Sequence, residues 1–97
     1  MNEEKQIGDM YFAAALVSYG SVMVRIDKTD KKHQKFVFED NTVSEIWVES
    51  GGKGSIHLRV VTPPIKDIEN YFFSKKLVYP PSYPDTIRSI KSAIHSM

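Results

Sequence analysis

The chain has 97 residues, enough for one hydrophobic core and too few for two, so the sequence predicts a single domain spanning residues 1–97. Thirteen basic and twelve acidic residues give a formal net charge of +1, which excludes a global field that would draw the protein onto a polyanion. Because the chain contains no cysteine, a disulfide framework, a thiolate metal site and a thiol nucleophile are excluded as well.

The first predicted helix covers residues 10–19. Residues 1–8 are polar and we expect them to be flexible, whereas Asp9 stands where a helix N-cap belongs. One face of the helix is apolar at spacings of four and three: Phe12, Leu16 and Tyr19. Gly20 can adopt the left-handed conformation that commonly ends a helix.

Segments with the period-two alternation of strands follow the helix. Their ranges are 21–27, 35–39, 43–50 and 55–61. In the first, the side chains predicted to face the core are Val22, Val24 and Ile26. In the second, Phe36 and Phe38 share one face, and we expect them to fill the core rather than to form a stacking platform.

Segment 43–50 also fits a helix, since Thr42 and Glu45 would then form a capping box. We favour the strand, because the alternating segment 55–61 follows a glycine-rich turn and needs an antiparallel neighbour. On this interpretation Ile46 and Val48 face one side of the sheet.

Two further helices are predicted at 64–75 and 86–96, with Thr62 and Asp85 as their N-caps. Each carries an apolar stripe at i, i+3 and i+7: Ile65, Ile68 and Phe72, and then Ile87, Ile90 and Ile94. The sequence therefore predicts an α+β fold with an N-terminal helix, an antiparallel β-meander of three to four strands, and two C-terminal helices packed on one sheet face.

The residue pattern is not typical of an enzyme. The histidines lie far apart in the sequence, without the spacing of metal ligands: His33, His57 and His95. The adjacent acids Glu39 and Asp40 are expected to form a solvated turn rather than a catalytic pair. We expect a non-enzymatic protein with no catalytic residue, metal, cofactor or small-molecule substrate.

The outer side of the predicted sheet indicates a protein partner. Trp47, His57 and Arg59 alternate with the core-facing positions, and aromatic residues and arginine are enriched in interface hot spots. These residues are predicted to bind a second copy of the chain or another protein. The alternative is that the chain itself covers Trp47.

Nucleic-acid binding is the alternative function, through the basic connection 28–35. The lysines that would contact phosphates are Lys28, Lys31, Lys32 and Lys35 in this connection and Lys75 and Lys76 after the second helix. A solvated charged loop explains the same residues, and the net charge near zero favours that explanation.

Three segments, YFAAALVSYG, KFVFED and YFFSKKL, carry a resemblance over less than half of the chain. They resemble a small domain family of bacteriophages and mobile elements that has no established activity. The resemblance implies a phage or prophage origin and a bacterial cytoplasm, and it supplies no functional residue. The acidic N-terminus and the short apolar run FAAALV also predict a cytoplasmic protein without a membrane span.

Overall fold

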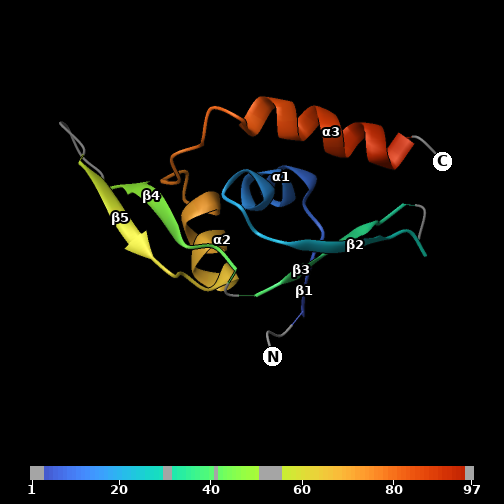
Figure 1. The fold of residues 1–97 in the computed structure, drawn as a ribbon, viewed down its shortest axis with the longest axis horizontal. Coiled ribbons are helices and arrows are strands. Elements are labelled where there is room, and N and C mark those ends of the chain that lie inside the picture. Colours follow the sequence, from blue (N-terminus) through green and yellow to red (C-terminus); the bar gives the residue numbers. More distant parts are fainter. Residues whose placement is uncertain (1–3, 30–31, 41, 51–55, 96–97) are drawn as a thin grey trace.

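The computed structural model describes residues 4–29, 32–40, 42–50 and 56–95 (Figure 1). Within these ranges the elements are β1 (Glu4–Ile7), α1 (Met10–Ser18), β2 (Met23–Asp27), β3 (Lys35–Glu39), β4 (Glu45–Glu49), β5 (His57–Val61), α2 (Ile65–Phe73) and α3 (Tyr83–His95). The predicted α+β class is confirmed, and segment 43–50 contains a strand. None of the helices in the described ranges is long and apolar enough to cross a membrane.

The strands form two antiparallel sheets rather than one meander. The first has the order β1-β3-β2, and the second pairs β4 with β5. Since β1 and β2 already occupy both edges of β3, β4 cannot pair with the strand that precedes it in the chain, as a meander would require. The chain instead leaves β3 at Asp40 and builds the second sheet beside α2 (Figure 1).

Strand β1 lies in the segment that the sequence predicts to be flexible. It pairs with β3 in a register that runs from Glu4 opposite Glu39 to Ile7 opposite Phe36. Ile7 is its buried side chain. One apolar residue in a polar tetrapeptide is a weak sequence signal for a strand. Pairing with β3, rather than the local sequence, therefore makes this segment a strand.

In the first half of strand β2, the side chains that face the core differ from those predicted. Val22 and Val24 are exposed and Met23 packs against the core in their place, whereas Ile26 packs against the core as predicted. The register with β3 shifts between Met23 and Arg25, and such a bulge reverses which side chains face inward.

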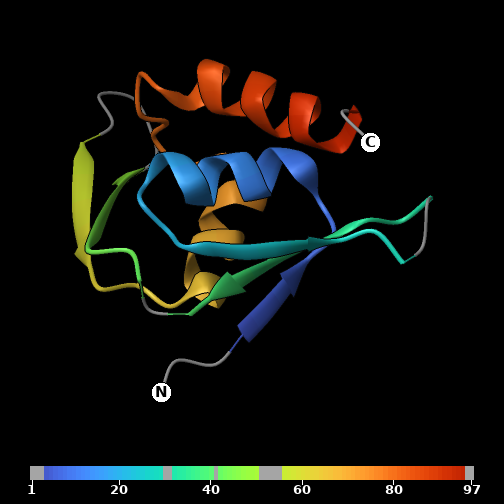
Figure 2. The same ribbon diagram turned by 45° about the vertical axis from the view of Figure 1, so that its right-hand side comes forward.

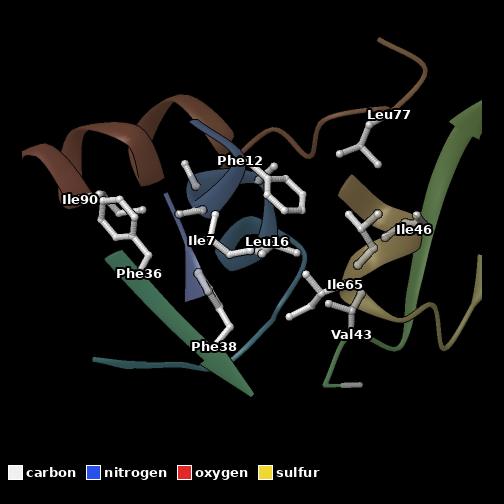
Figure 3. Packing of buried hydrophobic residues seen from close by; sticks show 14 of the residues in the cluster. Ile7, Phe12, Leu16, Phe36, Phe38, Val43, Ile46, Ile65, Leu77 and Ile90 are labelled. Atoms are coloured by element: carbon white, nitrogen blue, oxygen red, sulfur yellow. The ribbon is translucent and has the colours of Figure 1, made fainter. Parts of the chain in front are cut away.

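Helix α1 is the centre of the core. Its residues from Phe12 to Leu16 are fully buried, as expected for a helix that is apolar on every side. The three-stranded sheet covers one side of α1 and α3 covers the other, so α3 rests largely on α1 (Figure 2). Phe36 and Phe38 project from β3 toward α1 and are buried, which confirms their predicted role (Figure 3).

Helix α2 begins differently from the prediction. Thr62 has a positive φ of 50° and does not cap the helix, and the N-cap residue is Pro64, whose side chain makes no capping hydrogen bond. The Ile65 backbone N–H instead donates to Asp40 Oδ1 at 2.9 Å. Asp40 is only 8% exposed, so it is a buried cap and not the solvated turn predicted from the sequence.

Helix α3 begins at Tyr83, two residues before the predicted cap Asp85, which therefore lies in the first helical turn. There it forms an ion pair with Arg88 at 3.3 Å. The predicted apolar stripe is confirmed, since Ile90 is buried and Ile87 and Ile94 pack against the core.

Replacing Asp40 by alanine should lower the free energy of unfolding by about 1–3 kcal/mol, because the Ile65 N–H would remain buried without this acceptor. Urea unfolding followed by circular dichroism measures the change. Glu39→Ala, at the neighbouring acid, is the matched control. Equal decreases in the two variants would contradict the capping role of Asp40.

Candidate protein-binding site

The antiparallel register of β4 and β5 brings together the three residues predicted to bind a partner. Trp47 lies opposite Arg59, and Glu49 lies opposite His57. Because side chains alternate along strands, these residues share one side of the sheet, here called the outer face. The outer face consists of Glu45, Trp47, Glu49, His57, Arg59 and Val61.

The opposite side of β4 faces the core, where Ile46 and Val48 are buried. Trp47 retains 41% of its surface exposed, and Val61, also on the outer face, is largely exposed. The described part of the chain thus leaves a substantial portion of the indole open to solvent. An exposed tryptophan beside an exposed valine forms an apolar centre on this face.

Charged side chains surround this apolar centre. The Arg59 Nε donates to the Glu45 carboxylate across the two strands. This ion pair restricts the guanidinium, so less side-chain entropy remains to be lost when a partner binds. An apolar centre with a polar rim is the composition that protein interfaces favour.

The inner edge of β4 is held by the segment that follows α2. Glu49 N–H donates to the Lys76 carbonyl at 2.7 Å, and Val78 N–H donates to the Trp47 carbonyl at 2.9 Å. Leu77, between these hydrogen bonds, forms a bridge with Val48 and is buried. The backbone on either side of Trp47 is therefore fixed to the core.

The Tyr19 hydroxyl adds a polar anchor at the same place. It donates to the Val78 carbonyl and accepts from the Trp47 N–H at 3.3 Å. Burial raises the pKa of Tyr19 above its ordinary value. The sequence predicts Tyr19 only as part of an apolar stripe, because nothing local indicates that its hydroxyl meets a strand 28 residues away.

A second group of aromatic residues lies where α2 ends and α3 begins. The Tyr79 and Tyr83 rings stack with centroids 4.3 Å apart, and Phe72 meets Tyr79 edge to face at 6.3 Å. Burial raises the pKa of both tyrosines. These ring contacts fix the proline-containing segment against the helices.

The lysines of the alternative site do not form one surface. Lys75 and Lys76 follow α2, while the described residues of connection 28–35 lie at the opposite end of the molecule (Figures 1 and 2). Lys31 lies outside the described residues. Lys28 Nζ donates to the Ala93 carbonyl at 3.0 Å, where a cation stabilises the C-terminal end of α3.

A hollow of about 320 Å³ lies between connection 28–35 and the end of α3. Its lining includes two lysines, Lys32 and Lys35, and two histidines, His33 and His95. The two lysines come from connection 28–35, and His95 comes from the end of α3.

In the described ranges no group of three or more histidine, aspartate or glutamate side chains is placed to hold a metal ion. Comparisons with protein-family models, with curated proteins and with solved structures find no match to this chain. The resemblance to a phage domain family therefore stays a prediction from the sequence.

Tyr19→Phe should lower the free energy of unfolding by about 1 kcal/mol at neutral pH, because the variant cannot form the hydroxyl hydrogen bonds to β4 and Val78. It should also flatten the alkaline part of the stability profile. The raised pKa means that the unfolded chain releases this proton first, so the stabilisation is present below about pH 10 and is lost as pH rises through the folded-state pKa.

Urea unfolding of both proteins at a series of pH values from neutral to strongly alkaline measures both effects. An identical alkaline decline in the variant and the parent would contradict the anchoring role of Tyr19.

Proposed function

We propose that this chain is a small non-enzymatic binding protein that acts through protein–protein contacts made by the outer face of β4 and β5. The observation that carries the proposal is the register that sets Trp47 beside Arg59 while Trp47 remains 41% exposed. Tryptophan and arginine are the residue types that contribute most to interface hot spots.

The rigidity of the face supports the same function. Tyr19 and residues 76–78 hold the β4 backbone, and Glu45 holds Arg59, so a partner meets side chains that are already ordered. Binding to a preorganised surface costs less conformational entropy than binding to a mobile loop.

The bacterial cytoplasm and a phage or mobile-element origin belong to this proposal through the sequence resemblance alone. In that setting the partner is a protein of the host, a protein of the phage, or a second copy of this chain.

Trp47→Ser should weaken partner binding about 30-fold or more, because truncating a hot-spot tryptophan costs about 2 kcal/mol or more. The experiment captures partners on the immobilised protein, purifies the one that mass spectrometry identifies, and measures its affinity by calorimetry. Val24→Ser, at an exposed valine of β2, is the control. A purified partner that binds Trp47→Ser and the parent equally would contradict the proposal.

The hollow beside connection 28–35 favours a second candidate, binding of single-stranded nucleic acid. Lys32 and Lys35 both line it, which gives a local basic surface despite the net charge of +1. Removing one lysine that binds a phosphate should reduce the slope of log affinity against log salt by about one.

A labelled oligonucleotide titrated at low and moderate salt, followed by fluorescence anisotropy, tests this candidate. The double variant Lys32→Ala with Lys35→Ala should bind more weakly and show a shallower salt dependence. Lys75→Ala with Lys76→Ala, at the other end of the molecule, is the matched control. Absence of binding by the parent at low salt would rule the candidate out.

A further inference from the structure

Among the described strands, β1, β2 and β5 each have an open edge. β1 carries Glu4 and Lys5, and β2 is broken by the bulge between Met23 and Arg25, both of which are features that discourage pairing with another chain. β5 has neither lysine nor proline, its one arginine, Arg59, is bonded to Glu45 of β4, and it keeps an unbroken register with β4 from His57 to Val61. The edge of β5 is therefore the least protected of the three, and it lies at one extremity of the molecule (Figure 1).

The backbone of β5 presents regular hydrogen-bonding groups to this edge. Thr62 N–H donates to the Ser44 carbonyl at 2.7 Å, and the Ile56 carbonyl accepts from Ser50 N–H at 2.7 Å. Even-numbered residues of β5 thus bond to β4. The N–H and C=O groups of the alternate residues His57, Arg59 and Val61 point to the open edge.

The side chains of β5 are also incompletely covered. Leu58 lies opposite Val48 and shares its core-facing side, yet Leu58 is 51% exposed while Val48 is buried. Ile56, in the same row, is 67% exposed. The core-facing side of β5 therefore extends beyond the elements that cover β4, and apolar side chains on the same side of one more strand would pack beside this row.

We infer that β5 pairs edge to edge, antiparallel, with β5 of a second copy of this chain, which joins the two β4–β5 sheets into one four-stranded sheet. The inference rests on the proposed function, because it names a second copy as a protein partner, but it uses the open edge of β5 rather than the outer face. The two-fold axis passes between the two copies of Leu58. Ile56 then lies opposite Val60, and His57 opposite Arg59, of the other copy.

Self-complementarity of the strand argues for a second copy as the occupant. Pairing about the axis sets apolar Leu58 against itself and apolar Ile56 against apolar Val60. On the outer face, Glu49 lies opposite His57 on the neighbouring strand β4, and Glu45 accepts a hydrogen bond from Arg59. His57 and Arg59 of one copy, which would meet Arg59 and His57 of the other, therefore each have an acidic neighbour within their own chain. The register centred on Arg59 would instead oppose two guanidinium groups, which disfavours it.

The contact between two short strands is smaller than the interface of a permanent dimer, so we expect association in the micromolar range. Sedimentation velocity of the parent protein up to about 300 μM should show a dimer fraction that increases with concentration, since this is well above such a dissociation constant. A strict monomer over that range would overturn the inference.

A single cysteine tests the register, because the chain has no other thiol. Leu58 pairs with itself at a non-hydrogen-bonded position, where Cα atoms lie about 4.5 Å apart, within the range that a disulfide spans. At about 300 μM in a buffer of reduced and oxidised glutathione, in which oxidised glutathione is the oxidant, Leu58→Cys should form covalent dimers about tenfold faster than the control Val24→Cys, because pairing raises the effective thiol concentration. Equal rates would overturn the inference.

Introducing a charge at position 58, on the two-fold axis, provides an independent test. Leu58→Lys and Leu58→Glu should each sediment as monomers, because each would oppose like charges, and their equimolar mixture should recover the dimer. Circular dichroism confirms that both variants are folded. Dimers in either single variant, or only monomers in the mixture, would count against Leu58 at the axis.

The two proposals fail separately. If Leu58→Cys does not cross-link faster than its control but Trp47→Ser still binds a purified partner more weakly than the parent does, edge pairing is wrong and the outer face remains a binding surface. If Leu58→Cys cross-links and Trp47→Ser binds that partner as the parent does, the edge inference stands and the outer-face proposal is wrong.

Discussion

Burial of α1 on every side is the constraint on which the rest of this structure depends. The residues from Phe12 to Leu16 are inaccessible to solvent, so each direction around the helix needs a covering element. The three-stranded sheet supplies one cover and α3 another, while α2 contributes Ile65 and Ile68 to the same core. The alanines at 13–15 add little bulk, which allows these elements to approach the helix closely.

The second sheet is attached to this core through a few specific interactions. Tyr19, at the end of α1, forms hydrogen bonds through its hydroxyl with the backbone of Trp47 in β4 and with the backbone of Val78 beside it. Asp40, at the end of β3, caps α2 and so fixes the helix whose following segment completes the edge of β4. The core-facing side of β4 is buried as a result, whereas the outer face and the free edge of β5 project away from the core.

Local patterns predicted most of the element types, because helix and strand periodicity depend on side chains within a few residues of one another. Asp9 caps α1, Gly20 has the positive φ expected after a helix, and Phe36 and Phe38 are buried as predicted. Prediction was wrong where a distant partner decides the outcome. The β2 bulge reversed the prediction for Val22 and Val24 but not for Ile26. Asp40 is a buried cap because its carboxylate accepts from the first turn of a helix 25 residues later.

The sequence by itself determined the α+β class, the apolar stripes of α2 and α3, and the alternation that sets Trp47 apart from Ile46 and Val48. Only the tertiary structure decided that the strands form two sheets, that Glu4–Ile7 is a strand, that Lys75 and Lys76 lie far from connection 28–35, and that β5 has an open edge. The physical reason is that periodicity is set by neighbours along the chain. Strand pairing, capping across the fold and the exposure of an edge are set by groups that meet only after the chain has folded.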